Sequence, residues 1–305
     1  MAKMQISNVI YSHALKSGLL GKPCKFIPKQ NLLILGPSGT GKSFLCEIGF
    51  KKLLGLPIVM ADGSSMVSTG IYGNSIETIL TLLQSNNSLE WAQKGVVFID
   101  EIDKMPSRLY DQLLTSMQGT VFYVPKNLDY PKHEYVSFDT TNLTFVFAGS
   151  FSKGLEKTIE KRLGLKQIGF NKNTTVKKSV LNYTINEDLV SFLPKELIGR
   201  ISSITILEPL VKQDLIDILL KSNSSIYYKW VEFFRFHDIN LSIELFAISA
   251  IADFVANSDC SFGARQLEQI LSEILKDYVF NISSLRNSTI VIDKDEVIRK
   301  LNYSK

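Results

Sequence analysis

The sequence Gly36-Pro37-Ser38-Gly39-Thr40-Gly41-Lys42-Ser43 fits the pattern G-x-x-x-x-G-K-[ST]. An apolar run at residues 32–35 precedes it, and a helical pattern begins at Phe44. A buried strand, a glycine-rich loop and a helix in this order are typical of a P-loop, whose backbone N–H groups bind phosphate. We therefore expect this whole stretch to bind a nucleoside triphosphate, with Lys42 at the β- and γ-phosphates and Ser43 on Mg²⁺. The alternative is a glycine-rich turn without a ligand.

A second motif, Val96-Val97-Phe98-Ile99-Asp100-Glu101, supplies a pair of acidic residues. Its four apolar residues predict a fully buried strand of a parallel sheet, with the acids at the carboxyl end. We expect Asp100 to orient Mg²⁺ and Glu101 to act as the general base that polarises the attacking water. Paired acids at an ordinary exposed strand end are the alternative, and the preceding P-loop favours the catalytic interpretation.

The composition is that of a globular protein, with 45% hydrophobic and 21% charged residues. A net charge of +4 does not indicate nucleic-acid binding, which needs a concentrated basic stripe. The three cysteines, Cys24, Cys46 and Cys260, form no CxxC pair, so neither a zinc site nor a disulfide framework is expected. No apolar stretch reaches the ~18 residues of a membrane span, and no signal peptide is visible. We expect a cytoplasmic protein without a membrane partner.

Short apolar strands alternate with helical patterns in the first part of the chain. The strands are expected at residues 32–35, 58–60, 96–99, 143–148 and 203–207. This alternation predicts an α/β fold, in which a parallel sheet is covered by helices and ligands lie at the carboxyl ends of the strands.

Longer helical patterns follow from Val211 onward. They are expected at residues 212–222, 225–236, 243–257 and 263–280. A last strand at Ser288–Ile292 is expected to precede a short basic tail. We place a boundary near Glu208-Pro209, because proline resists continuing a strand or a helix. The sequence thus predicts a large P-loop domain at 1–208 and a smaller, mostly helical domain at 209–305.

Several blocks of sequence resemble the ClpX family of AAA+ ATPases, and the resemblance covers nearly the whole chain. The blocks are Phe98–Lys104, Leu193–Arg200, Phe262–Arg265, Gly119–Val121 and Asp139-Thr140. Other AAA+ ATPases share the first of them, and the combination indicates ClpX. Members of this family are unfoldases that feed the ClpP peptidase. The resemblance therefore implies a P-loop AAA+ large domain, a smaller helical domain, and a homo-hexamer that uses ATP and Mg²⁺.

The resemblance also implies roles for two arginines. Arg200 is similar to the arginine finger, which reaches the γ-phosphate of a neighbouring subunit and stabilises transition-state charge. Arg265 matches the sensor-2 element, which contacts the nucleotide of its own chain. A surface salt bridge for Arg200 and a solvated helix start for Arg265 are the alternatives. Ser150, after the fourth strand, is a sensor-1 candidate or a helix cap.

Two loops resemble segments with which the family contacts its substrates. Gly70-Ile71-Tyr72-Gly73 is similar to the pore loop Gly-Tyr-Val-Gly, with the aromatic residue one position later. Ile71 and Tyr72 are therefore candidates for gripping a polypeptide, and a turn with a packed tyrosine is the alternative. Pro131-Lys132-His133 resembles the Arg-Lys-His loop near the substrate entrance, where Lys132 and His133 attract acidic chain ends. A solvated loop is the alternative.

A third loop, within the polar stretch at 164–179, resembles the segment with which the family docks on ClpP. Its tip is Ile168-Gly169-Phe170, whose apolar side chains stand among polar neighbours. Exposed apolar groups in such a loop usually mark a contact site. The alternative is that Ile168 and Phe170 tuck into the core.

The sequence departs from the family pattern near its beginning. The four-cysteine zinc domain and the Val-Ile-Gly-Gln segment that helps to hold adenine do not occur in it. The helix that usually follows that segment is expected at Ile6–Lys16. We expect a shortened ClpX-like protein without a zinc domain.

Three functional hypotheses remain. The first is an ATP-dependent unfoldase and translocase that delivers protein substrates to ClpP. The second is a regulatory subunit that co-assembles with a full-length ClpX or blocks ClpP. The third is a nucleic-acid AAA+ protein, which the small net charge and the Ile168–Phe170 loop disfavour.

Overall fold

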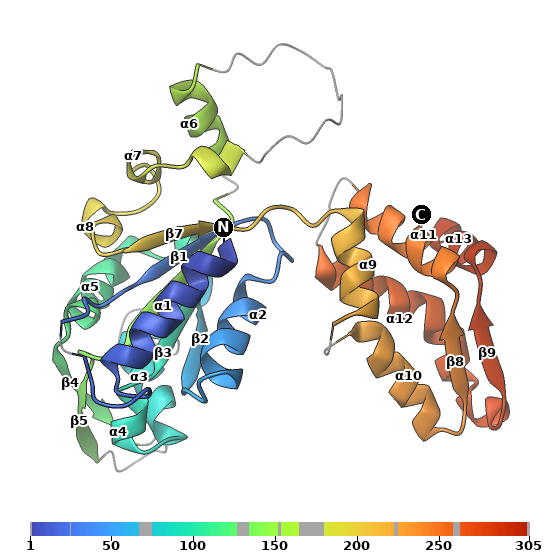
Figure 1. Cartoon of the computed structure of the whole chain (residues 1–305), viewed down its shortest axis with the longest axis horizontal. Coiled ribbons are helices and arrows are strands. Elements are labelled where there is room, and N and C mark those ends of the chain that lie inside the picture. Colours follow the sequence, from blue (N-terminus) through green and yellow to red (C-terminus); the bar gives the residue numbers. More distant parts are fainter. Residues whose placement is uncertain are drawn as a thin grey trace. The chain divides into compact units, whose positions relative to one another are not determined.

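The computed structural model describes residues 2–24, 26–66, 75–126, 134–151, 154–164, 180–222, 225–258 and 263–303. Its contacts divide the chain into two compact units. The first unit comprises Met1–Pro37 and Lys42–Leu207, and the second comprises Ser38–Gly41 and Glu208–Lys305. Figure 1 labels the elements of both.

The first unit is built on a five-stranded parallel sheet with the order β2-β3-β6-β1-β7. The strands are β1 (Leu32–Leu35), β2 (Ile58–Asp62), β3 (Val96–Asp100), β6 (Thr144–Gly149) and β7 (Ser203–Ile206). The expected α/β class with a parallel sheet is confirmed. The five strands of this sheet fall where the apolar runs predict them, with ends shifted by no more than two residues.

Helices cover both faces of this sheet (Figure 1). The helices of the first unit are α1 (Ala2–Lys16), α2 (Lys42–Cys46), α3 (Ile76–Ser85), α4 (Leu89–Ala92), α5 (Tyr110–Gln118), α6 (Leu155–Arg162), α7 (Asn186–Leu189) and α8 (Lys195–Ile198), of which α6 and α7 lie beyond the edge of the sheet. A hairpin of β4 (Val121–Pro125) and β5 (Tyr135–Asp139) adds a small antiparallel sheet.

Alternate residues of each central strand enter two different cores. Leu33 and Leu35 of β1 join the core with α3 and α5, whereas Leu32 and Ile34 join the core with α1 and α2. Both faces are therefore buried, which explains why these strands read as continuous apolar runs rather than alternating ones.

The helix that follows the P-loop changes its geometry after one turn. Beyond α2 it continues as a π-helix over Glu47–Lys52, inside which Gly49 faces Ile10 of α1. A Cβ atom on Gly49 would clash with Cδ1 of Ile10, so a larger residue there would require the end of that side chain to move.

Asn31, immediately before β1, ties that strand to both of its neighbours. Its side-chain amide donates to the carbonyl of Arg200 at 3.0 Å and accepts from the N–H of Phe145 at 3.2 Å. Since Asn31 is buried, these bonds fix the start of β1 against the chain leading to β7 and against β6.

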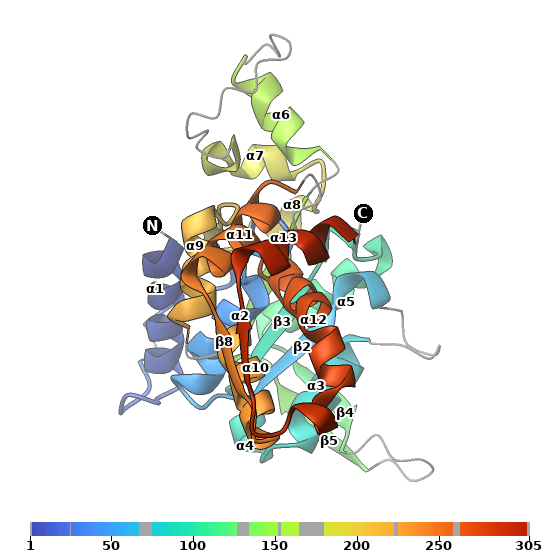
Figure 2. The same cartoon turned by 90° about the vertical axis from the view of Figure 1, so that its right-hand side faces the viewer.

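The second unit is mostly helical, as expected (Figure 2). Its helices are α9 (Lys212–Leu220), α10 (Ile226–Phe236), α11 (Leu245–Ala256), α12 (Ala264–Phe280) and α13 (Lys294–Tyr303), and its strands are β8 (Asn240–Ile243) and β9 (Thr289–Ile292). The two strands pair in parallel. None of the helices in the described part of the chain is long and apolar enough to cross a membrane.

The expected basic tail is wrong, because the chain after β9 forms α13. The carboxylate of Asp293 accepts the N–H of Glu296 and so caps this helix. Val297 and Leu301, four residues apart, are buried in the core of the second unit. Strand β8, which the sequence analysis missed, precedes α11 and alternates buried and exposed residues.

His13 of α1 is buried and uncharged. Its Nε2 donates to the carbonyl of Lys94 at 2.9 Å, because a carbonyl oxygen can only accept. Nδ1 then accepts the hydroxyl of Thr144 at 2.7 Å. Burial lowers the pKa of His13 from 6.5 to about 4.

We predict that His13 makes the fold sensitive to acid. Between pH 6.5 and about 4 the unfolded chain binds a proton that folded His13 does not. The free energy of unfolding therefore falls as the pH is lowered through this window, by up to about 3 kcal/mol from this group. The measurement is urea unfolding of the wild type and His13→Gln at both pH values, in a Trp230→Phe background where Trp91 reports on the first unit. A difference between the two proteins that does not change with pH would contradict this.

Candidate nucleotide-binding site

The P-loop connects β1 to α2 and starts at a tight approach of two backbones. A Cβ atom on Gly36 would lie 2.6 Å from the carbonyl oxygen of Leu207, at the end of β7. Gly41 adopts φ +89°, in the region that favours glycine. Glycine is therefore required at the first and the last glycine position of the motif for two different reasons.

Lys42 is almost fully buried and is held by the loop itself. Its ammonium group donates to the carbonyls of Gly36 at 2.9 Å and Pro37 at 2.8 Å. The side chain thus lies beside the end of β1, where its charge faces main-chain oxygen atoms.

Ser43 and Asp100 bring the two motifs together. The hydroxyl of Ser43 donates to Oδ2 of Asp100 at 3.2 Å. The other carboxylate oxygen of Asp100 accepts the N–H of Glu101 at 2.9 Å. A hydroxyl and a carboxylate therefore meet at the carboxyl edge of the sheet, as parallel α/β sheets commonly arrange their ligand-binding groups.

Glu101 has an uncommon backbone conformation, with φ 50° and ψ 41°. This left-handed region is unfavourable for a residue that carries a Cβ atom. The carbonyl oxygen of Glu101 lies so close to Gly63 that a Cβ atom there would be 2.8 Å away. Local strain thus orients the residue that follows the buried strand.

The carboxylate of Glu101 forms an ion pair with Lys104. The two groups are 2.8 Å apart, and each side chain is 40% exposed. The hydrogen bond to Glu101 raises the pKa of Lys104 above its ordinary value. Lys104 was not singled out from the sequence, although its place three residues after Glu101 within a short helical turn is a signal for such a pair.

Asp103 is a third acidic residue that lies close to this edge of the sheet. A Cβ atom on Gly149, the last residue of β6, would lie 2.7 Å from Oδ1 of Asp103. This oxygen has no hydrogen-bond partner among the described residues. Burial raises the pKa of Asp103 above its ordinary value. Ser150, the sensor-1 candidate, is half-buried directly after Gly149.

The two candidate arginines belong to different units. Arg200 is half-buried in the first unit and donates to the carbonyl of Leu114 in α5 at 2.5 Å. Arg265 is exposed in the first turn of α12 in the second unit. In that unit, the N–H of Ala264 donates to the carbonyl of Gly39 at 3.1 Å.

Several sequence-predicted residues lie outside the described residues. They are Ile71 and Tyr72 of the candidate pore loop, Lys132 and His133 of the candidate entrance loop, and Ile168, Gly169 and Phe170 of the candidate docking loop. Within the described ranges, no group of three or more His, Cys, Asp and Glu residues is arranged to hold a metal ion.

A P-loop after the first strand of a parallel α/β sheet, with an acidic pair at the end of another strand, is the arrangement of a P-loop NTPase. The family model described as "ATPase family associated with various cellular activities (AAA)" matches residues 32–166. The chain is therefore a P-loop ATPase that binds a nucleotide.

Similar proteins define the family more narrowly. ClpX of Borrelia duttonii is 31% identical over 97% of this chain and 74% of its own length. ClpX of Porphyromonas gingivalis is 33% identical over 90% of this chain and 72% of its own length. ClpX of Treponema denticola is 31% identical over 96% of this chain and 76% of its own length. Each is described as an ATP-dependent Clp protease ATP-binding subunit. The chain belongs to the ClpX family, which confirms the resemblance seen in the sequence.

We predict that the left-handed backbone of Glu101 lowers the free energy of unfolding of the protein. Glu101→Gly and Glu101→Ala both remove the carboxylate and its ion pair, but only glycine relieves the left-handed conformation. The free energy of unfolding should therefore be about 0.5 to 1 kcal/mol higher for the glycine variant than for the alanine variant. At most positions the alanine variant is the more stable of the two. Chemical unfolding of both variants measures this difference.

The matched control is Lys104→Ala, which removes the ion pair without changing residue 101. Exposed pairs of this kind contribute about 0 to 1 kcal/mol, so a small effect is expected. An alanine variant as stable as the glycine variant would show that position 101 carries no backbone strain.

Proposed function

We propose that the chain is a cytoplasmic, ATP-dependent protein unfoldase and translocase that delivers substrates to the ClpP peptidase. It works as a homo-hexamer, with ATP and Mg²⁺ at each interface. The meeting of Ser43, Asp100 and Glu101 at one sheet edge carries this proposal, together with the ClpX relatives named as the ATP-binding subunit of a Clp protease.

The residues present fit a nucleotide with its magnesium ion. A glycine-rich loop provides N–H groups for phosphate oxygens, and the buried ammonium group of Lys42 donates to carbonyls of the same loop and so lies within it. Ser43 and Asp100 offer the hard oxygen ligands that Mg²⁺ prefers. When bound, the ion neutralises charge on the phosphates.

Glu101 is proposed to accept the proton of the attacking water. Its carboxylate is half-exposed and pairs with the exposed ammonium group of Lys104. An exposed ion pair is weak, so Glu101 can exchange Lys104 for a water molecule at little cost. Asp100, which accepts the N–H of Glu101, holds the backbone of the base in place.

Arg200 and Arg265 are proposed to act in the assembled ring. Arg200 would leave the carbonyl of Leu114 and approach the γ-phosphate in a neighbouring subunit, where a guanidinium stabilises developing charge. Arg265 would contact the nucleotide of its own chain and link the nucleotide state to the second unit.

Three loops are proposed to convert hydrolysis into work on a protein. Ile71 and Tyr72 would grip the translocating chain, Lys132 and His133 would attract acidic chain ends, and Ile168-Gly169-Phe170 would dock on ClpP. Their similarity to the corresponding family segments supports these assignments.

The second candidate function is a regulatory subunit that joins a full-length ClpX or blocks ClpP. One observation favours it. The guanidinium of Arg200 donates through Nη1 to the carbonyl of Leu114 in its own chain, and this contact draws it away from a role in a neighbouring subunit.

We predict that Glu101→Gln retains ATP binding but lowers turnover by about 10²- to 10⁴-fold, because the amide cannot accept the proton. The assay is ATP-dependent loss of fluorescence from a folded, tagged fluorescent protein in the presence of ClpP, with several tags tried. Wild type should remove the fluorescence, and Glu101→Gln should not.

Glu134→Gln is the matched control, since Glu134 is an exposed residue that pairs with Lys126. It should behave like the wild type. Near-normal hydrolysis by Glu101→Gln would contradict the role of the base. A wild type that binds ClpP but removes fluorescence from none of the substrates would favour the regulatory subunit.

A further inference from the structure

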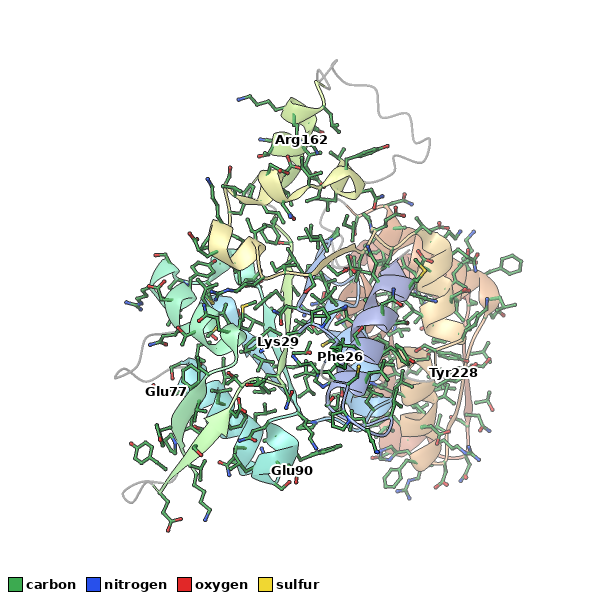
Figure 3. The ribbon with its side chains drawn as sticks, turned by 60° about the vertical axis from the view of Figure 1, so that its left-hand side comes forward. Phe26, Lys29, Glu77, Glu90, Arg162 and Tyr228 are labelled. Carbon is green, nitrogen blue, oxygen red and sulfur yellow. The ribbon has the colours of Figure 1, made fainter. Side chains whose placement is uncertain are left out.

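An ion pair between Arg162 and Asp188 joins the two parts of the chain that flank residues 165–179, the segment with the candidate docking residues. Arg162 is the last residue of α6, and Asp188 lies in α7, on the chain that returns after residue 180. Figure 3 shows Arg162 at the end of α6, beside this returning chain. The pair therefore joins the chain just before residues 165–179 to the chain just after them.

The geometry of this pair is specific. Nε of Arg162 donates to Oδ1 of Asp188 at 2.8 Å, and Nη2 donates to Oδ2 at 3.0 Å. Nη2 also donates to the carbonyl of Tyr183 at 2.6 Å. The planar guanidinium thus contacts the returning chain at two points, which a lysine cannot reproduce.

Asp188 is itself fixed. It is 2% exposed, and its Oδ2 also accepts the N–H of Ile185 at 3.0 Å. Burial opposes its ionisation, but the hydrogen bonds from Arg162 and Ile185 outweigh this effect and lower the pKa of Asp188. A buried carboxylate with these partners stays charged at neutral pH and keeps Arg162 in one position.

Apolar contacts hold the two chain segments independently of the ion pair. Leu155 and Ile159 of α6, Leu181 of the returning chain and Leu189 of α7 are all buried in the core of the first unit. These apolar anchors remain when the ion pair is lost, but the buried Asp188 carboxylate then lacks its cation. Replacing both charged residues together removes this unpaired buried charge and so separates positioning from stability.

We propose that Arg162 and Asp188 are positioning residues for ClpP docking, because they hold the chain that leads into residues 165–179 beside the chain that follows them. This inference rests on the proposed function. A segment with fixed ends loses less conformational freedom when its tip binds, and several tips in a ring can then bind together.

The test measures ClpP binding and ATP hydrolysis separately. Arg162→Gln should leave the ATPase rate without ClpP within about twofold of the wild type. The concentration of ClpP that gives half-maximal degradation should rise about tenfold or more, because weaker presentation affects every docking segment of the ring at once. The maximal rate at saturating ClpP should change little.

Two further variants separate positioning from general stability. Arg162→Lys keeps the charge but cannot form the bidentate contact, so it should show most of the loss. Asp188→Asn combined with Arg162→Gln should be no worse than Arg162→Gln alone, because both act through one contact. Arg235→Gln, which removes an exposed pair with Glu232 in the second unit, is the matched control and should bind ClpP normally.

The outcomes are distinct. Weaker ClpP binding with normal ATP hydrolysis supports the inference. Unchanged ClpP binding by Arg162→Gln and Arg162→Lys overturns it and leaves the proposed function intact. A wild type that hydrolyses ATP but does not bind ClpP overturns the proposed function and this inference with it.

Discussion

Parallel pairing of β1, β3 and β6 is the constraint on which the nucleotide site depends. Val146 of β6 is the register partner of Leu32 on one side and of Phe98 on the other. β1 and β3 therefore end within one residue of each other, and the residues that follow them leave the sheet at the same edge. Ser43 and Asp100, far apart in sequence, can meet there only because this register is kept.

Local contacts then fix the conformations of individual charged residues that the sheet and its connections bring into position. The carbonyls of Gly36 and Pro37 hold Lys42, a left-handed backbone orients Glu101, and a bidentate ion pair joins Arg162 to Asp188. In each case a charged group that is proposed to contact a phosphate or a water molecule, or to position a docking segment, is held by local contacts on a buried apolar scaffold. Such support is what a functional group needs in order to keep one geometry.

The fold class and the family could be predicted from the sequence, because fully buried parallel strands read as apolar runs and because the P-loop pattern is specific. Strand β8 was missed, since its half-buried alternation is short and abuts a helical pattern. Helix α13 was taken for a tail because its charged residues concealed Val297 and Leu301. The conformation of Glu101, the partner of Arg200 and the ion pair at Arg162 depend on tertiary contacts that no local pattern records.

The most direct test of this account is ATP binding and steady-state hydrolysis by the purified chain, with and without Mg²⁺, compared with Lys42→Ala. Saturable binding and Mg²⁺-dependent hydrolysis that are both lost in Lys42→Ala are the predicted result, because the loop then lacks its cation for the phosphates. Hydrolysis that is unchanged in Lys42→Ala, or a wild type that binds no ATP, would contradict the assignment of the nucleotide site.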